Sequence, residues 1–223
     1  MDKVKKIVLS LGGSLLYKNG SLDIQYIKSF TNLIKEYYAK GYWFGIVVGG
    51  GYIARSFQEQ LKKYLDARGL DWVGIRATHL NAEILRQLLR DIAFDNIITD
   101  YRNIPKTDKI LVGGGWLPGS STDYDTVYLA YRTGVRVVIN LSNVDGILID
   151  GRIIEKVSYN QLLRIVPEWK PGLHFPIDKK ALLFAKERKM TFIHINGRNL
   201  DNFRNLLDGK DFIGTVVSDS YGM

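Results

Sequence analysis

The sequence predicts an α/β protein in which a mostly parallel sheet is covered by helices on both faces. Short apolar runs rich in valine and isoleucine alternate with longer segments whose apolar residues recur every three or four positions. Three of the apolar runs end in clusters of glycine. These observations predict a three-layer αβα sandwich that binds its ligands at the carboxyl ends of the strands.

Six apolar runs predict the strands. In chain order they are Lys6–Leu11, Trp43–Val48, Asn96–Ile98, Lys109–Val112, Val135–Leu141 and Thr191–Ile195. Between them the apolar spacing predicts helices, as with Ile24, Ile27 and Phe30 on one helical face. The predicted helices are Asp23–Ala39, Tyr52–Ala67, Trp72–Ile92, Thr122–Arg132, Asp178–Lys189 and Leu200–Leu207. Alternation of strand and helix favours parallel pairing of the strands.

Length and composition are those of an ordinary globular chain. With 223 residues, 46% of them hydrophobic, the chain is compatible with a single domain over residues 1–223. The five prolines are dispersed, and the absence of cysteine excludes disulfides and thiolate chemistry. No apolar run approaches the roughly 20 residues that a membrane span requires. We expect a cytoplasmic protein that has no membrane partner.

The net charge of +8 raises the question of an anionic partner. Lysine and arginine are scattered along predicted helical faces, as in KEYYAK, EQLKKYLDAR and FAKERKM, rather than concentrated in a basic tail. This distribution favours solvated surface residues over nucleic acid as the main partner. A positive field also steers small polyanionic substrates toward a cleft.

Two glycine clusters directly follow predicted strands, in IVLSLGGSLL at Ile7–Leu16 and in FGIVVGGGYIAR at Phe44–Arg55. A strand that breaks into glycines and then enters a helix presents bare backbone N–H groups and a helix N-terminus to an anion. Two such cradles predict two phosphorylated ligands. An enzyme that transfers a phosphoryl group between two nucleotides needs this arrangement.

A third cluster, Gly113–Gly115, is followed by a proline turn and by hydroxyl and carboxyl residues at a predicted helix start. Such residues are usually simple helix caps. Because they follow a third strand in a fold that already carries two glycine loops, we interpret them as members of one site. They are Ser120, Ser121, Thr122 and Asp123.

The common nucleotide and catalytic fingerprints are missing. There is no GxxxxGK[ST], and GGGWLPG fails the GxGxxG pattern because Pro118 occupies the last glycine position. No HExxH, CxxC or GxSxG occurs. The three histidines, His79, His174 and His194, lie far apart in the sequence without metal-ligand spacing. We interpret each as a packing or surface residue.

Six segments, taken in order, carry a resemblance that covers nearly the whole chain: SLGGSLL, VVGGGYIAR, DWVGIRATHLNAEIL, VGGGWLPGSSTDYDTVYLA, VVINLSNVDGILI and GTVV. They resemble the amino acid kinase superfamily and, within it, the uridylate kinases of the archaeal type. The resemblance implies the amino acid kinase fold, with an acceptor-binding part at about residues 1–135 and an ATP-binding part at about 136–223. It also implies transfer of the γ-phosphoryl group of ATP to UMP, giving UDP, with Mg²⁺ bound mainly through the nucleotide phosphates.

The resemblance further implies roles for individual residues. Implied ATP-binding residues are Gly12, Gly13, Ser14, Asn143, Val144, Asp145 and Gly146. Implied UMP-binding residues are Gly49, Gly50, Gly51, Arg55, Asp71, Gly114, Ser121 and Thr122. Implied catalytic residues are Asp123, Asp178 and Lys180. The second pKa of a phosphomonoester is about 6, so the attacking oxygen needs no general base, and catalysis depends on alignment and charge stabilisation.

Three positions depart from the family pattern. Ser10 or Leu9 stands where many members have a lysine in the first strand, and NVDG continues as ILIDGRIIEK without the usual tyrosine and Asp-Pro pair. Leu183 stands where archaeal relatives carry a lysine. Lys180 and Lys186 lie one helical turn to either side on nearly the same face. Either would reach the same anion, or both are solvated lysines.

Two other functions stay open. One is another small-molecule kinase of the superfamily, acting on a carboxylate, a carbamate or isopentenyl phosphate. The other is a nucleotide-binding regulatory protein with little catalytic activity. The resemblance also implies a homo-oligomer, a hexamer in the uridylate kinases. The aromatic residues Tyr37, Tyr38, Tyr42 and Trp43 either pack in the core or cover a partner subunit.

Overall fold

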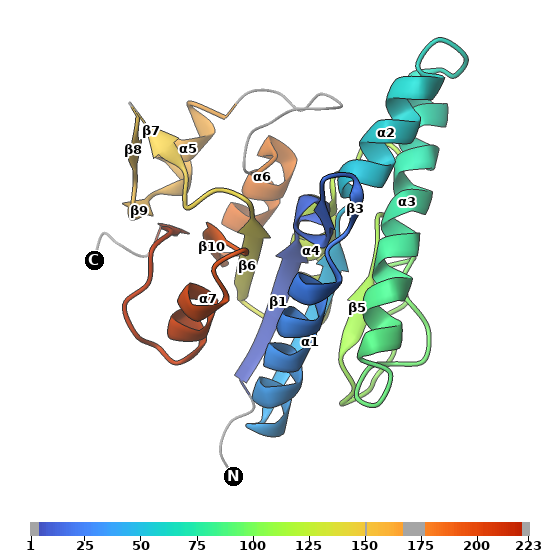
Figure 1. The fold of residues 1–223 in the computed structure, drawn as a ribbon. Helices are drawn as coiled ribbons and strands as arrows, with labels where there is room; N and C mark the ends of the chain where they lie inside the picture. The colour runs from blue at the N-terminus through green and yellow to red at the C-terminus, as the bar shows by residue number, and fades with distance from the viewer. Residues whose placement is uncertain (1–4, 150, 167–176, 220–223) are drawn as a thin grey trace.

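The computed structural model describes residues 5–149, 151–166 and 177–219, and within them a seven-stranded sheet forms the centre of the molecule (Figure 1). Its strand order is β5-β4-β1-β6-β10-β11-β9. All neighbouring strands pair in parallel except β10 and β11. The strands are β1 (Lys5–Leu11), β4 (Tyr42–Val48), β5 (Leu111–Gly113), β6 (Val137–Ser142), β9 (Lys156–Val157), β10 (Thr191–Asn196) and β11 (Thr215–Val217).

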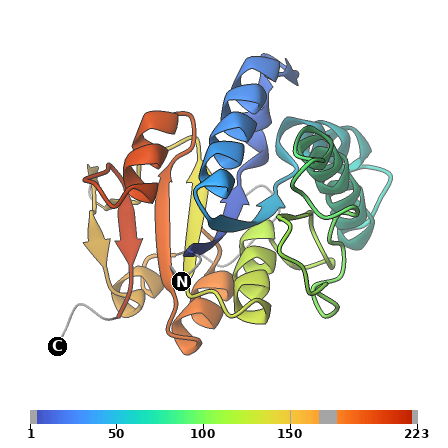
Figure 2. The same ribbon diagram turned by 90° about the horizontal axis from the view of Figure 1, so that it is seen from below.

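Helices cover both faces of this sheet (Figure 2). One face carries α1 (Ile24–Ala39), α3 (Ala67–Leu88) and α7 (Leu200–Leu207), and the other carries α4 (Thr122–Arg132), α5 (Tyr159–Leu163) and α6 (Lys179–Glu187). The remaining elements are the 3-10 helix η1 (Gly13–Leu16), α2 (Gly51–Leu61) and two small hairpins, β2 (Tyr17–Lys18) with β3 (Ser21–Leu22) and β7 (Leu148–Ile149) with β8 (Arg152–Ile153). The predicted αβα sandwich with a mostly parallel sheet is confirmed.

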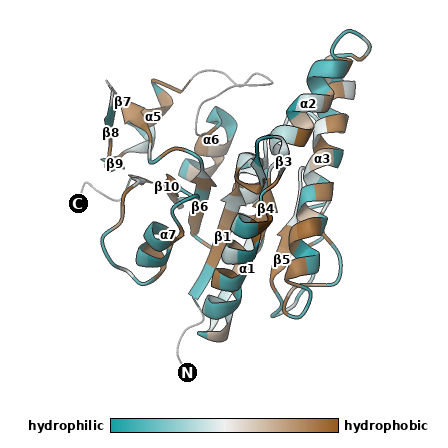
Figure 3. Cartoon of the chain, in the orientation of Figure 1, coloured by the Kyte–Doolittle hydropathy of each residue, from teal (hydrophilic) through white to brown (hydrophobic). Residues whose placement is uncertain are grey.

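Each face of the sheet has its own hydrophobic core. Alternate residues of a strand point to opposite faces, so Leu9 and Leu11 of β1 join the core under α1, α3 and α7, whereas Val8 joins the core under α4, α5 and α6. In Figure 3 the strands at the centre are brown and the outward faces of the helices are largely teal. Burial of these apolar side chains is the main stabilising term of the sandwich.

The aromatic residues near the end of α1 belong to the interior. Tyr37 and Tyr42 are buried in the core on one face of the sheet, against which Tyr38 packs partly buried, and Trp43 is buried in the core on the other face. The interpretation that they pack in the core is therefore confirmed. No helix among the described residues is both long enough and apolar enough to cross a membrane.

Several predicted boundaries were wrong. The segment Asn96–Ile98 is not a strand, because only Ile98 forms an isolated bridge with Gly113 at the sheet edge. The helix predicted at Tyr52–Ala67 ends at Leu61. Within the predicted range Asp66 already caps the next helix, α3, by accepting a hydrogen bond from the Gly69 amide at 2.7 Å. Consequently α3 begins five residues before the predicted Trp72. The strands β9 and β11, of 2 and 3 residues, were not predicted.

Parallel register brings the predicted loops to one edge. Leu11 at the end of β1 pairs with Val48 of β4 and with Leu141 of β6, and Val47 pairs with Gly113 at the end of β5. The three glycine clusters and the Asn143–Gly146 loop therefore leave the sheet side by side. Of the residues interpreted from the sequence, His174 lies outside the described residues.

Candidate active site

The first two glycine loops touch each other backbone to backbone. A Cβ atom on Gly13 would lie 2.3 Å from the Gly49 oxygen and 2.3 Å from the Gly51 nitrogen, and one on Gly51 would lie 2.2 Å from the Gly13 oxygen. Gly51 also has φ +59°, a conformation that side chains disfavour. Only glycine permits this contact. The loops after β1 and β4 consequently form one continuous backbone surface.

Not every amide of these loops is available to an anion. The Gly12 amide donates to the Leu141 carbonyl at 2.8 Å, and the Gly49 amide donates to the Leu11 carbonyl at 2.9 Å, so both continue the sheet ladder. Gly13 and Ser14 begin η1, while Gly50 caps and Gly51 begins α2. The first amides of a helix have no intrahelical acceptor. These four residues, rather than Gly12 and Gly49, are therefore the ones whose amides are free of the sheet ladder and of an intrahelical acceptor.

A cavity of about 160 Å³ lies beside the second glycine loop. It is lined by five of the residues predicted to bind the acceptor, namely Gly50, Gly51, Arg55, Asp71 and Thr122, together with others that include Gly115 and Ser120. The predicted acceptor residues Gly49, Gly114 and Ser121 do not line it. Segments 50–55, 71–78 and 115–122 thus meet around one hollow, and Arg55 supplies its cation.

Two buried polar residues that the sequence did not single out hold the third loop. The carboxylate of Asp125, which is fully buried, accepts the Trp116 amide at 3.0 Å and the Ser120 hydroxyl at 3.2 Å. Thr78 Oγ1 accepts the Gly115 amide at 2.6 Å. Burial raises the pKa of Asp125 to about 7. In the sequence, the only indication that Asp125 belongs to this site is its position in the first turn of α4, two residues after Asp123.

Asp71 and His79 also act on this loop. Asp71 Oδ2 accepts the Gly119 amide at 2.8 Å. The Nε2 of His79 lies 2.7 Å from the Gly115 carbonyl oxygen and donates to it, and Arg76 lies on the other ring nitrogen at 3.3 Å. Burial lowers the pKa of His79, so the ring is neutral at pH 7. The interpretation of His79 as a packing residue agrees with these contacts.

Two predicted catalytic carboxylates lie between the glycine loops and α6. Asp178 caps α6, accepting the Ala181 amide at 2.8 Å through Oδ1 and the Ser121 hydroxyl through Oδ2. Asp123 Oδ1 accepts the Ser10 hydroxyl at 2.9 Å. Burial, and secondly the charge of Asp178, raise the pKa of Asp123 to about 7. The Ser10 hydroxyl therefore helps to hold this carboxyl group in place.

The two candidate lysines of α6 are placed differently. The Lys180 ammonium lies 4.2 Å from the centroid of the Tyr124 ring, and its charge lowers the pKa of Asp125 and Asp178 against the larger effect of burial. Lys186 donates instead to Asn160 of α5. Leu183 is 45% exposed. Of the two lysines, Lys180 is the cation beside the carboxylates.

The Asn143–Gly146 loop borders the other side of this edge. Asn143, Val144 and Asp145 are exposed, whereas Gly146 is buried. Ser142 Oγ accepts the Val144 amide at 3.2 Å and lies 3.1 Å from Nε2 of the buried His194. Burial lowers the pKa of His194 to about 4, so it packs as a neutral ring beneath the loop, in agreement with its interpretation from the sequence.

A hollow of about 660 Å³ reaches this loop at Asp145. Asp145, Asn196 and Arg198 are among its lining residues, together with residues at the start of α1. It is about four times the volume of the acceptor cavity. Of the predicted ATP-binding residues only Asp145 lines the larger hollow, whereas five of the predicted acceptor residues line the smaller one.

Comparison with known proteins identifies the family. The model of the amino acid kinase family matches residues 5–195. The chain belongs to the amino acid kinase family. Within this family, it is 31% identical to the uridylate kinase of Methanospirillum hungatei over 95% of this chain and 94% of that protein. It is 29% identical to the uridylate kinase of Thermoplasma acidophilum over 96% and 97% of the two chains.

Solved structures of the family agree with the fold. The crystal structure of uridylate kinase from Archaeoglobus fulgidus matches with a TM-score of 0.82 at 28% identity, covering 95% of this chain and 99% of that one. A UMP kinase structure from Ureaplasma parvum matches with a TM-score of 0.78 at 22% identity, covering 97% and 100%. The predicted membership of the amino acid kinase superfamily is confirmed.

Proposed function

We propose that this member of the amino acid kinase family is a UMP kinase that transfers the γ-phosphoryl group of ATP to UMP and releases UDP. The observation that carries the proposal is the backbone contact between the first two glycine loops. It brings two anion-binding helix starts together at one edge of the sheet. The near full-length similarity to proteins named uridylate kinase supports UMP as the acceptor.

The geometry gives each loop a task. The amides of Gly50 and Gly51 at the start of α2, with Arg55, bind the UMP phosphate, and those of Gly13 and Ser14 bind the ATP phosphates. A phosphate oxygen of UMP then attacks in line, without a general base because the phosphate is largely ionised at neutral pH. Lys180 and the oriented amides stabilise the negative charge that spreads during transfer.

Magnesium enters this proposal as the ion that accompanies ATP. Among the described residues no group of three or more His, Cys, Asp or Glu side chains is arranged to bind a metal ion. Asp123 and Asp178 nevertheless offer carboxylate oxygens, the donors that Mg²⁺ prefers, and would hold the ion from the protein side. When bound, Mg²⁺ neutralises charge on the β- and γ-phosphates.

Coupled measurement of ADP release tests the proposal against the other kinases. UMP, CMP, AMP, glutamate, aspartate and isopentenyl phosphate are offered separately with MgATP. We expect the highest kcat/KM with UMP and no turnover with the two amino acids, because Arg55 and the second glycine loop form a site for a phosphate. Turnover with another acceptor and none with UMP would contradict the assignment.

A nucleotide-binding regulatory protein is the second candidate, and exposed Leu183 in α6 is the observation that favours it. Leu183 lies one helical turn from Lys180. A lysine or arginine at this position would place a second cation near the phosphates, and leucine does not. Calorimetry with UMP and UTP separates the two functions. Tight binding without any turnover would establish the regulatory protein, whereas binding accompanied by turnover establishes the kinase.

Assembly into a homo-oligomer is a further part of the proposal. Since Tyr37, Tyr42 and Trp43 are buried, the subunit interface uses other surfaces. Light scattering after size-exclusion chromatography measures the assembly. A mass several times the 25.4 kDa of one chain is expected, and a mass of one chain would contradict this part of the proposal.

A further inference from the structure

The turn between β10 and α7 carries an arginine whose guanidinium donates its hydrogen bonds to groups near the start of the chain. Arg198 donates from Nη1 to Asp23 Oδ2 at 2.7 Å and from Nη2 to the carbonyls of Tyr17 at 2.8 Å and Ser14 at 3.2 Å. Its guanidinium carbon lies 4.9 Å from the centroid of the Tyr26 ring. One side chain therefore holds four groups that are about 180 residues away in the sequence.

These groups enclose the segment that follows the first glycine loop. Ser14 is the second residue of η1, and Tyr17 directly follows η1. Asp23 caps α1 by accepting the Tyr26 amide at 3.0 Å, and its own amide donates to the Leu16 carbonyl at 2.8 Å. Carbonyls in a single 3-10 turn lack regular intrahelical donors. Arg198 supplies donors for the Ser14 carbonyl inside η1 and for the Tyr17 carbonyl directly after it, and so holds this turn in place.

The rest of the turn is fitted to the same region. A Cβ atom on Gly197 would lie 2.5 Å from Leu15 Cδ1, so this residue packs directly on η1. The Gly197 carbonyl accepts the Tyr26 hydroxyl at 2.9 Å. Asn196 Nδ2 donates to Asp145 Oδ1 in the Asn143–Gly146 loop at 2.9 Å. Residues 196–198 thus contact both η1 and the Asn143–Gly146 loop.

We propose that Arg198 is a positioning residue for phosphoryl transfer, which holds η1 so that the amides of Gly13 and Ser14 face the ATP phosphates. This inference rests on the proposed kinase activity. The charge of Arg198 is committed to Asp23, whose pKa is lowered by the Tyr26 amide and then by Arg198. It therefore acts through the glycine loop and not as a ligand of the nucleotide. A planar fork suits this task, because lysine has a single donor centre.

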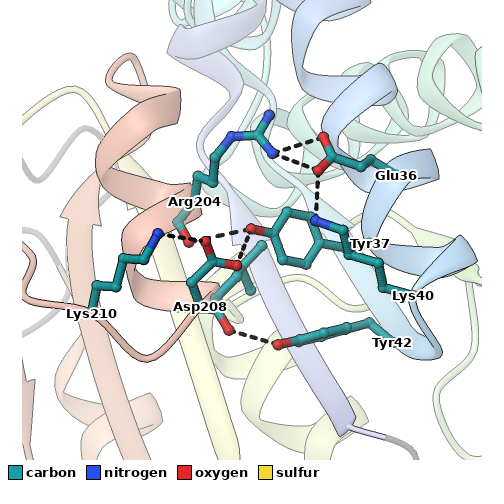
Figure 4. Close-up of polar contacts among 8 residues, drawn as sticks. Glu36, Tyr37, Lys40, Tyr42, Arg204, Asp208 and Lys210 are labelled. Atoms are coloured by element: carbon teal, nitrogen blue, oxygen red, sulfur yellow. Dashed lines mark hydrogen bonds and ion pairs between the residues drawn. The ribbon is translucent and has the colours of Figure 1, made fainter.

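A matched control exists at the other end of α1. Arg204 of α7 donates from Nη1 to both carboxylate oxygens of Glu36 at 2.7 Å, and Glu36 also accepts Lys40 at 2.7 Å (Figure 4). Beside this pair, the Tyr37 hydroxyl donates to Asp208 at 2.6 Å. Like Arg198, Arg204 links the β10–α7 region to α1 by an ion pair that is partly exposed. Unlike Arg198, it makes no contact with the glycine loop.

Four proteins are compared: wild type, Arg198→Ala, Arg198→Lys and Arg204→Ala. Steady-state kinetics are measured with ATP and UMP varied in turn, together with the midpoint of thermal unfolding. We expect Arg198→Ala to lower kcat/KM for ATP about 30-fold, as misplacement of a binding group does. KM for UMP should change less than about twofold, because the residues that Arg198 contacts do not line the acceptor cavity. Arg198→Lys should recover part of the loss, and Arg204→Ala should retain wild-type kinetics.

Binding of a non-hydrolysable ATP analogue to each of the four proteins is also measured by calorimetry. Equal kinetic losses in Arg198→Ala and Arg204→Ala, or equal increases of both KM values in Arg198→Ala, would show that Arg198 is merely structural and overturn the proposal. Should Arg198→Ala fail to fold, the same comparison is made with Arg198→Lys. A wild type that binds the analogue but never phosphorylates UMP would refute the proposed function alone, and weaker analogue binding in the Arg198 variants would still support the positioning role.

Discussion

The site has two sides: the acceptor side, with the second and third glycine loops, and the nucleotide side, with the Asn143–Gly146 loop where ATP is proposed to bind. Different contacts hold the two sides in place. On the acceptor side, fully buried Asp125 and Asn81 bind loop backbone, with Asn81 Nδ2 donating to the carbonyls of Gly49 and Gly50 at 2.8 Å and 3.1 Å. On the nucleotide side, the Asn143–Gly146 loop is largely exposed, and partly exposed Asn196 and Arg198 bind beside it. Buried, fully paired backbone is the more rigid of the two. The acceptor side is therefore preorganised, whereas the nucleotide side depends on contacts near solvent.

The two sides also differ in the titratable groups that they bury. The acceptor side buries Asp125, whose pKa is raised, and half-buries Asp123, whose pKa is raised as well. The nucleotide side buries His194, whose pKa is lowered. In each case burial disfavours the charged form. The contributions of the two sides to the free energy of unfolding are therefore expected to change with pH in opposite directions.

The largest expected effect comes from filling the contact between the glycine loops. Gly51→Ala should reduce the free energy of unfolding by about 4 kcal/mol, because a Cβ there meets the Gly13 backbone and φ is positive. The matched variant Gly134→Ala has a similar φ of +70° but nothing within 4 Å of the added Cβ, and should lose only about 1 kcal/mol. Urea unfolding measures both. Equal losses would show that the loops do not press on each other.

The second-largest effect is expected when Asp123 loses its charge but keeps its size. Asp123→Asn keeps an acceptor for the Ser10 hydroxyl and removes the charge, so kcat should fall about 100-fold with little change in KM for UMP. Above pH 7 the variant should unfold at a higher temperature than wild type, since it no longer buries an ionised carboxylate. Asp100→Asn, at a surface pair with Arg102, is the control. Unchanged kcat in Asp123→Asn would remove Asp123 from the catalytic residues.

The acceptor side should lose stability as pH rises. The pKa of Asp125 is about 7 in the folded protein against an ordinary value of 3.8, so the folded state binds the extra proton between these values. From pH 6 to pH 8 this group should lower the free energy of unfolding by about 1.5 kcal/mol. Asp125→Asn keeps hydrogen-bonding groups for Trp116 and Ser120 and should show a correspondingly weaker pH dependence. Identical slopes in urea unfolding would contradict the burial of a titrating carboxyl.

The nucleotide side should respond in the opposite sense and more weakly. His194 has a pKa of about 4 in the folded protein against an ordinary value of 6.5, so its contribution to stability is complete above pH 6.5 and is lost as pH falls toward 4. Between pH 8 and pH 6 the loss should be about 1 kcal/mol. His194→Gln, which retains a group for Ser142, should lack this loss. An NMR signal assigned to His194 that titrates near pH 6.5 in the folded protein would contradict this prediction.

Local signals in the sequence predicted most of the fold and the backbone part of the site. Apolar periodicity predicted the long strands and helices, and glycine clusters after strands predicted the loops that meet at one edge of the sheet. Residues that begin helices, such as Ser121 and Asp178, were predicted individually. Their hydrogen bond to each other spans 57 residues and depends on how α4 packs against α6. That packing is a tertiary property, which local patterns do not contain.

The residues that the sequence did not reveal share one physical property. Thr78, Asp125 and Arg198 bind backbone atoms of distant loops, and their own neighbours in the chain give no sign of it. In the sequence alone Arg198 looks like any solvated arginine, because its hydrogen-bond acceptors lie near the start of the chain. The short strands β9 and β11 were missed for a related reason, since 2 or 3 residues show no periodicity. Sequence patterns thus predicted the position of the glycine loops better than the side chains that support them.

The most direct test of the central claim is a crystal structure with UMP and a non-hydrolysable ATP analogue bound together. The account predicts the UMP phosphate at the amides of Gly50 and Gly51 beside Arg55, and the γ-phosphate at those of Gly13 and Ser14. The attacking oxygen should lie about 3 to 3.5 Å from the γ-phosphorus and in line with the bond that breaks. UMP bound beside Asn143–Gly146, or two phosphates that do not meet across the glycine loops, would contradict it.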